Sequence, residues 1–375
     1  MTAAPRHVYV HVPFCARRCS YCDFSIAVRR DVPVHEFIDA LRRELRIRLG
    51  HPHTPLDIDT LYFGGGTPSH LGPDGVTSMM VLMREYFRWT PDAEVTLEAN
   101  PDDVTATATA AWWRAGITRV SLGAQSFDAR VLDWMHRTHG PSQIDAAVEL
   151  LRETPFTSWS FDLIFALPAA LGRSWERDLD LALGKCPPHL SLYGLTVEPG
   201  TPLGRWADRG EVQPGDESAY EREFLSAHDG AAAAGFDHYE VSNFAQPGHH
   251  AQHNRSYWRG VPYLGFGPSA HGFDGATRRW NRAAYAAWQK AVVGGEDPIG
   301  GSEPIGEGEQ LLESVYLGLR TTGGLAVGPE ELEQVRPWVA AGWAQIDDGR
   351  VILTPLGWLR LDSLAAALTP VRGSP

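Results

Sequence analysis

The chain of 375 residues is poor in cysteine: it has four, and three of them, Cys15, Cys19 and Cys22, lie within eight residues. So few cysteines in a chain of this length exclude the disulfide framework of a small secreted domain. Clustered thiols in a reducing compartment favour a metal ion or a metal cluster instead. The fourth cysteine, Cys186, is followed by two prolines and is interpreted as a buried or loop thiol without a ligand role.

Basic residues and long apolar runs are also scarce. The 33 Lys and Arg residues against 46 Asp and Glu give a formal net charge of −13, which disfavours broad binding to nucleic acid or to an anionic membrane. No apolar run approaches the ~18 residues of a membrane-spanning helix, and residues 1–6 lack the apolar core of a signal peptide. We therefore expect a cytoplasmic protein that binds no nucleic acid.

Strand-like and helix-like patterns alternate along the first two thirds of the chain. Residues 7–12 form a short β-rich run, residues 36–45 have the apolar spacing of a helix, and residues 107–116 indicate a helix that ends at a glycine. Six such β-α units in succession predict parallel strands joined by crossover helices. The expected fold class is therefore α/β, a partial (β/α)6 barrel.

Three regions are expected on this basis: a barrel core over residues 1–235, an extension over 236–300 that completes the side of the barrel, and a small C-terminal domain over 301–375. The glycine- and proline-rich segment 293–309 is the best candidate for a linker. Beyond it the pattern predicts helix, hairpin and helix, as in a winged-helix-like module. This module has no basic recognition helix, which argues against DNA binding.

The most reactive residues follow the predicted strands. In a β/α barrel the site is built from the loops after the strands. This rule brings together five segments that are scattered in the sequence: Cys15–Cys22, Gly64–Thr67, Glu98, Gln125 and Asp162. We expect them at a single mouth of the barrel.

The spacing C-x3-C-x2-C supplies three ligands, one fewer than a closed metal site needs. Three cysteines can bind three irons of a 4Fe-4S cluster and leave the fourth iron open. A structural zinc site needs four ligands, so His11 or Asp23 would have to complete it. The cluster is the preferred interpretation, and a zinc-stabilised scaffold is an alternative.

Residues 9–22, YVHVPFCARRCSYC, resemble the cluster loop of the radical S-adenosylmethionine (SAM) enzymes. More narrowly, the chain resembles, from about residue 7 to 368, the branch that holds oxygen-independent coproporphyrinogen III dehydrogenase and the HemW heme chaperones. In that family the amino and carboxylate groups of SAM chelate the open iron. An electron from the cluster, supplied by an electron donor, then cleaves SAM to methionine and a 5′-deoxyadenosyl radical.

The resemblance implies further cofactor contacts. The glycine motif at residues 64–69 matches a segment whose backbone contacts the methionine end of SAM, and Glu98 matches an acidic residue that accepts hydrogen bonds from ribose-like hydroxyls. For each matching polar residue the plain alternative is a polar group at a strand end. The implied SAM contacts are Tyr9, Tyr21, Gly65, Gly66, Thr67, Glu98, Gln125, Arg137 and Asp162.

Two features separate the branches of this family. The decarboxylating enzymes resemble C-x3-C-x2-C-x-C, whereas Phe24 occupies the last of these positions here. HNRSYW, residues 253–258, matches the H-N-x-x-Y-W motif of the HemW proteins, which implies His253 as a heme ligand. His249 and His250 are competitors for that role, and the role of His271 stays open.

The resemblance therefore implies a heme chaperone that binds a 4Fe-4S cluster, SAM and heme. It would deliver heme to apo-hemoproteins such as respiratory enzymes, as a cytoplasmic protein peripheral at the inner membrane and as a homodimer. No coproporphyrinogen turnover is required of it. The alternative is an oxygen-independent coproporphyrinogen III dehydrogenase, which converts two propionates to vinyl groups by radical oxidative decarboxylation.

Overall fold

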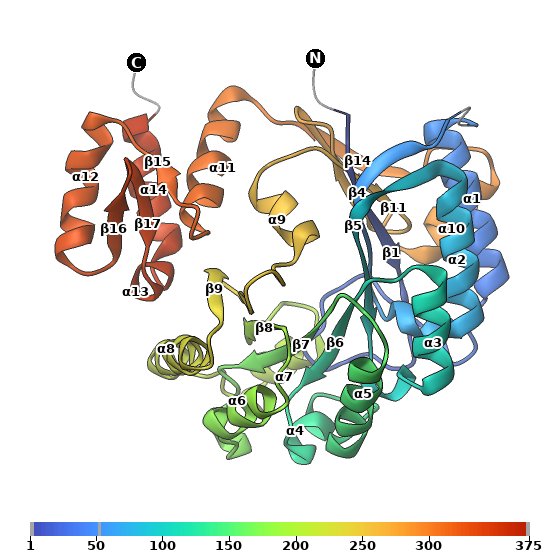
Figure 1. The fold of residues 1–375 in the computed structure, drawn as a ribbon, viewed down its shortest axis with the longest axis horizontal. Coiled ribbons are helices and arrows are strands. Elements are labelled where there is room, and N and C mark those ends of the chain that lie inside the picture. The colour runs from blue at the N-terminus through green and yellow to red at the C-terminus, as the bar shows by residue number, and fades with distance from the viewer. Residues whose placement is uncertain (1–3, 52–53, 373–375) are drawn as a thin grey trace.

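The main body of the chain is built on one sheet of twelve strands (Figure 1). The computed structural model describes residues 4–51 and 54–372, so the ends of the predicted outer domains, residues 1–3 and 373–375, lie outside it. The strands of the predicted β-α pattern are β1 (His7–Val12), β4 (Leu56–Gly65), β5 (Phe87–Ala99), β6 (Arg119–Gln125), β7 (Ser158–Phe165) and β8 (His189–Gly194).

These six strands lie side by side in chain order, and each pairs in parallel with the next. Within the described residues the sheet stays open, with β14 (Ile299–Pro304) and β9 (Asp237–Glu240) at its edges. The predicted partial (β/α)6 barrel is therefore confirmed. Parallel pairing sends all six carboxyl ends to the same edge of the sheet, which is where the site must form.

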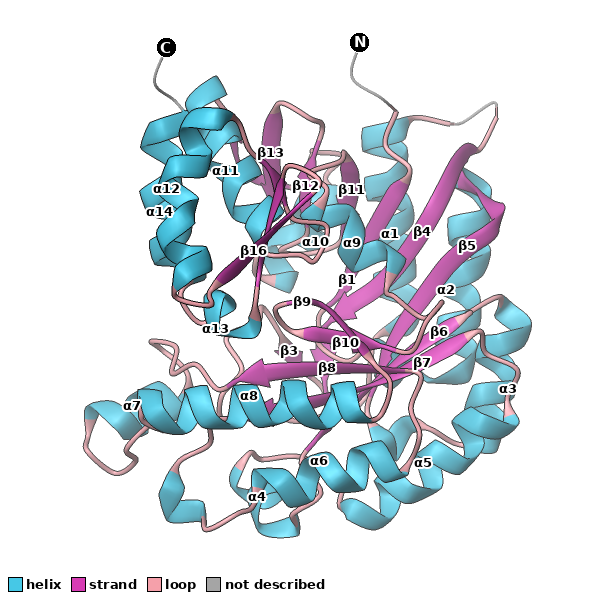
Figure 2. Cartoon of the chain, turned by 60° about the vertical axis from the view of Figure 1, so that its left-hand side comes forward, coloured by secondary structure: helices cyan, strands magenta, loops and turns pink. Residues whose placement is uncertain are grey.

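Helices cover the outer face of this curved sheet (Figures 1 and 2). Apolar side chains of the strands that pack against these helices, such as Val8 and Val10, are fully buried. The helix α3 begins after Thr105, whose hydroxyl accepts a hydrogen bond from the amide of Ala108 at 3.2 Å, and it ends at Gly116 with φ 104°. Only glycine adopts that left-handed conformation without strain. The helices are α1 (Val34–Leu49), α2 (Gly72–Tyr86), α3 (Ala106–Ala115), α4 (Ala129–Trp134), α5 (Pro141–Glu153), α6 (Trp175–Gly184), α7 (Pro202–Asp208) and α8 (Glu217–Ala233).

The region after residue 235 extends the sheet at both edges. At one edge β10 (Asn243–Ala245) and β9 pair antiparallel beside β8. At the other edge β11 (Tyr263–Phe266) pairs in parallel with β1, and β12 (His271–Phe273), β13 (Thr277–Asn281) and β14 follow as an antiparallel meander. Two helices belong to this region, α9 (Gln252–Trp258) and α10 (Tyr285–Val293).

The predicted linker at 293–309 is wrong for most of its length. It contains β14, and α11 (Glu307–Leu319) begins before it ends. Glycine and proline are tolerated there because β14 is an edge strand, where a missing donor or side chain costs least.

The C-terminal part folds around a small sheet of its own, ordered β15-β17-β16, and the winged-helix-like prediction is confirmed. A buried ion pair between Arg320 and Glu240, at 2.9 Å, joins it to the main sheet.

None of the helices in the described ranges combines the length and apolar character of a membrane span. The remaining elements are β15 (Leu325–Ala326), α12 (Pro329–Ala340), β16 (Ala344–Asp347), β17 (Arg350–Leu353), α13 (Pro355–Trp358) and α14 (Leu361–Arg372).

Candidate cluster and cofactor site

The three clustered cysteines line one cavity of about 440 Å³ at the carboxyl ends of the parallel strands, which we call the cysteine cavity. The Cys15 thiol is buried and lies 3.3 Å from the hydroxyl of Thr67, and the sulfur of Cys19 accepts a hydrogen bond from Arg137 at 3.3 Å. Burial raises the pKa of the Cys15 thiol to about 11 and also raises that of Cys22. Three thiolates in this place therefore require a strong positive charge beside them, and a metal cluster supplies one.

The cysteines are held by short backbone pairs. Cys15 belongs to β2 (Phe14–Cys15), which pairs with β3 (Ala27–Val28), so the loop between these strands carries Cys19 and Cys22. Thr67 donates its amide to the carbonyl of Phe14 at 2.8 Å. Both ends of the cysteine loop are thus fixed, by the pairing of β2 with β3 and by the backbone bond to Thr67 after β4.

Glycines let β4 approach the cysteine loop closely. A side chain at Gly66 would place its Cβ 2.7 Å from the backbone carbonyl of Pro13. Gly65 has φ 112°, and a Cβ there would lie 2.4 Å from the ring of His11. Gly65, Gly66 and Thr67 all line the cysteine cavity.

Two partly buried carboxyl groups form another wall of the cysteine cavity. Glu98 accepts hydrogen bonds from the hydroxyl of Tyr62 at 2.8 Å and from the amide of Gly65 at 3.0 Å. Asp162 accepts one from Ser121 at 3.0 Å. Burial raises the pKa of Glu98 to about 7 and that of Asp162 to about 6. Near neutral pH these groups can accept further hydrogen bonds from hydroxyl groups or attract a cation.

Arg137 joins the cysteine loop to the strand ends. It lies in the segment after α4 and donates to Cys19, to the side-chain oxygen of Asn100 at 2.5 Å and to the carbonyl of Gly123 at 2.9 Å. Gln125, with a strained φ of 68°, lines the same cavity. Sequence reasoning missed Asn100, although it directly follows β5 and the strand-end rule covers it.

Most of the predicted cofactor residues thus come together at the cysteine cavity. Tyr21 is among them, whereas Tyr9 and His253 are not. Tyr9 lines an adjoining cavity instead, where its hydroxyl lies 3.2 Å from the Nδ1 of His11. Tyr9 and His11 are two residues apart in β1 and therefore point to the same face.

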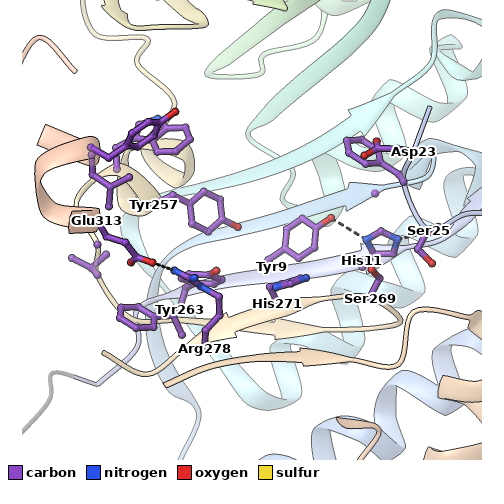
Figure 3. A pocket seen from close by; sticks show the side chains of 18 of the residues that line it. Tyr9, His11, Asp23, Ser25, Tyr257, Tyr263, Ser269, His271, Arg278 and Glu313 are labelled. Carbon is purple, nitrogen blue, oxygen red and sulfur yellow. Dashed lines mark hydrogen bonds and ion pairs between the residues drawn. The ribbon is translucent and has the colours of Figure 1, made fainter. Parts of the chain in front are cut away.

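The adjoining cavity, which we call the aromatic cavity, has a volume of about 870 Å³ (Figure 3). It shares Asp23, Phe24, Gly65 and Glu98 with the cysteine cavity. Its walls come from β1, from the β11–β13 edge, from α9 with the following turn, and from α11 of the C-terminal part. Its apolar lining consists of Phe24, Tyr257, Trp258, Val261, Tyr263, Phe273, Leu312, Tyr316 and Leu317.

His253 lies behind this wall rather than in it. Its side chain is buried, with 1% exposed, and its ring stacks on that of Tyr62. Its Nδ1 lies 2.7 Å from the hydroxyl of Thr60, and its Nε2 lies 2.8 Å from the hydroxyl of Tyr257. Both ring nitrogens are therefore occupied, and binding of heme iron by His253 would require one of these bonds to break.

The other two histidines considered for that role also lie outside the lining of the aromatic cavity. The Nδ1 of His249 is 3.2 Å from the hydroxyl of Ser158, and the Nε2 of His250 is 3.4 Å from a carboxylate oxygen of Asp237.

An open α/β sheet with three cysteines on the loop after its first strand defines a radical SAM protein, and residues 9–182 match the radical SAM superfamily. Membership implies a 4Fe-4S cluster and SAM, and the three thiols and two partly buried carboxyl groups of the cysteine cavity fit them. The chain belongs to the HemW family within that superfamily. It is 36% identical to the heme chaperone HemW of Mycobacterium tuberculosis (strain ATCC 25618 / H37Rv), over 98% of this chain and 96% of the relative.

Other relatives agree. The chain is 36% identical to the heme chaperone HemW of Escherichia coli (strain K12), over 72% of this chain and 70% of the relative. It is 37% identical to the mitochondrial radical S-adenosyl methionine domain-containing protein 1 of Mus musculus, over 71% of this chain and 60% of that protein. Among solved structures, coproporphyrinogen III oxidase (HemN) from Escherichia coli superposes with a TM-score of 0.79 at 21% identity, covering 97% of this chain and 90% of that one. This likeness shows a shared fold.

Proposed function

We propose that the protein is a heme chaperone that binds a 4Fe-4S cluster and SAM in the cysteine cavity and heme in the aromatic cavity. It delivers heme to apo-hemoproteins, with respiratory enzymes at the inner membrane as the recipients, and it acts in the cytoplasm as a homodimer served by an electron donor. The division into a core over 1–235, an extension over 236–300 and a small domain over 301–375 belongs to the same proposal.

The observation that carries the proposal is the aromatic cavity itself. Small-molecule sites are concave, mostly apolar and roughly 300–1,000 Å³ in volume, and this cavity, at about 870 Å³, lies in that range. A flat macrocycle such as heme is well matched by a wall of aromatic rings. The naming of the relatives as heme chaperones, over nearly the full length of this chain, supports the same choice of ligand.

The cysteine cavity is proposed to hold the other cofactors. Cys15, Cys19 and Cys22 would bind three irons, and the bound cluster and SAM would supply one-electron chemistry. Glu98 and Asp162 would accept hydrogen bonds from the bound nucleoside. The remaining predicted contacts keep their proposed roles. Iron ligation by His253, which the motif implies, is the alternative that requires its hydrogen bond with Thr60 or with Tyr257 to break.

The test is an anaerobic reconstitution followed by heme titration and by transfer of bound heme to an apo-hemoprotein. We expect about one heme per chain, and transfer that is faster than from free heme in the same buffer. A reconstituted protein that binds no heme, or that binds it and never releases it to a recipient, would contradict the proposal.

The cysteine assignment is tested in the same preparation. Cys15→Ser, Cys19→Ser and Cys22→Ser are each expected to abolish cluster assembly, measured as iron and sulfide per chain. Cys186→Ser is the matched control, since this exposed thiol lies outside the cysteine cavity. Zinc without iron or sulfide in the wild-type protein would support the scaffold alternative.

A coproporphyrinogen III dehydrogenase is the second candidate, because the fold is shared with such an enzyme. Phe24, at the shared rim of the two cavities, stands where the decarboxylase pattern has a cysteine. Incubation of the reconstituted protein with coproporphyrinogen III, SAM and a reductant decides between them. Catalytic formation of protoporphyrinogen and 5′-deoxyadenosine would favour the enzyme.

A further inference from the structure

A heme iron in the aromatic cavity needs a ligand that reaches it, and imidazole is the common protein ligand. Two histidines line this cavity, His11 and His271. His11 is buried, and both of its ring nitrogens have partners: the hydroxyl of Tyr9 at 3.2 Å and the carbonyl of Ser25 at 2.9 Å (Figure 3). His11 is therefore fixed in place as part of the wall.

His271 differs in every respect that matters for ligation. It is the first residue of β12, its side chain is exposed, and within the described ranges its ring takes part in no hydrogen bond or ion pair. Its ring stacks against that of Trp280 on the paired strand β13, with centroids 5.9 Å apart and planes at 25°. The stacking orients the imidazole while leaving its nitrogens free.

We propose that His271 provides the iron ligand for heme bound in the aromatic cavity; this inference rests on the heme binding proposed above. The wall of the cavity partly shields the ring of His271 from water, and this desolvation, together with the nearby Arg278, lowers its pKa. The ring is therefore neutral near pH 7, with a lone pair available for iron. Figure 3 shows His271 among the side chains that line the cavity, together with Tyr9 and His11.

The surroundings of His271 also suit the propionates of heme. Arg278, on β13, is the one guanidinium among the described residues that line the cavity. It makes ion pairs with Glu313 of α11 at 2.8 Å and with Glu303 of β14 at 3.2 Å. A propionate can take the place of one of these exchangeable surface partners, and this fixes the macrocycle with its edge at Arg278.

On this inference His253 is a positioning residue. Its Nε2 holds the hydroxyl of Tyr257, which forms part of the apolar wall, and its Nδ1 ties that wall to Thr60 in β4. Its loss should therefore loosen the wall and weaken heme binding, without changing which atom binds the iron.

The experiment is a heme titration of the full-length reconstituted protein, with absorption and electron paramagnetic resonance spectra of the ferric complex. Wild type is compared with His271→Ala, His253→Gln and His35→Ala, the last being an exposed histidine on α1 as a matched control. We expect His271→Ala to lose the imidazole-ligated spectrum and to bind heme at least about tenfold more weakly. Added imidazole should restore the spectrum in this variant.

The other variants should keep the wild-type spectrum, with His253→Gln changing affinity only. Thermal unfolding of each heme-free variant checks that the fold is intact. An unchanged spectrum and affinity in His271→Ala, or loss of the imidazole signature in a folded His253→Gln, would overturn the inference while leaving heme binding itself in place. A wild-type protein that binds no heme would instead overturn the proposed function.

Discussion

The partly buried Glu98 makes the stability of the cofactor-free protein depend on pH in a direction that can be worked out. Burial raises the pKa of this carboxyl group from 4.5 to about 7. At about 1.4 kcal/mol per unit, the shift corresponds to about 3 kcal/mol. Below pH 4.5 the group is neutral in the folded and unfolded states. Between that pH and about 7 the unfolded chain loses its proton first, so the free energy of unfolding falls.

The variant Glu98→Gln isolates this effect because its side chain is neutral at every pH. The amide side chain of the variant has one acceptor oxygen and cannot accept from both the hydroxyl of Tyr62 and the backbone amide of Gly65. At low pH the free energy of unfolding of the variant is therefore about 1 kcal/mol lower than that of wild type. That loss is constant with pH. Relative to wild type, the variant should therefore gain about 3 kcal/mol between pH 4.5 and pH 8. Asp162 is present in both proteins, but its charge helps to raise the pKa of Glu98, so the measured difference includes the interaction between these two carboxyl groups.

Urea unfolding of cluster-free, reduced protein at four or five pH values measures this difference, with the exposed Glu153→Gln as the matched control. A difference between wild type and Glu98→Gln that stays flat from pH 4.5 to 8 would refute the reasoning. It would mean that water or another group solvates Glu98 in the folded protein.

Two other substitutions test the frame around the site. Glu44→Ala should lower the free energy of unfolding by ~3–5 kcal/mol, because four donors around its buried carboxylate lose this partner. The control is Glu36→Ala, which changes an exposed residue on the same helix. Equal urea midpoints for the two variants would contradict this prediction. Gly66→Ala should reduce iron and sulfide per chain after reconstitution, since its Cβ would meet Pro13 at 2.7 Å. Gly184→Ala, with open space around it, should load normally.

Much of the fold was predictable because the alternation of strand and helix leaves few arrangements. Parallel strands joined by helices bring their carboxyl ends to one edge, and this alone assembles Glu98, Gln125 and Asp162 beside the cysteines. The period of two along a strand would also have placed Tyr9 with His11 on a face away from Val8 and Val10. The prediction for Tyr9 followed the family motif instead.

The environment of His253 could not be read from its motif. Nothing in residues 253–258 says which side of α9 packs against the sheet. The partner of its Nδ1 is Thr60, which is 193 residues earlier in the chain. The backbone amide of His253 donates to Glu94 of β5 at 2.9 Å, and such contacts between α9 and the sheet, which no local pattern reveals, bring these segments together. His271 was left without a role for the same reason, since the cavity that it lines is formed by segments from both ends of the chain.

The two cavities share one short segment, and this has a thermodynamic consequence. Asp23 and Phe24 line both of them and directly follow Cys22. The side chain of Phe24 is 59% exposed, so the described part of the chain does little to fix it. Whatever holds Cys22 also restricts Phe24, and with it the rim of the aromatic cavity. A ligand in one cavity then changes affinity in the other through the difference that it makes to this rim or to Gly65 and Glu98, which both cavities also share. If the two cavities bind SAM and heme as proposed, the reciprocity of binding free energies requires that SAM change heme affinity by the same factor by which heme changes SAM affinity.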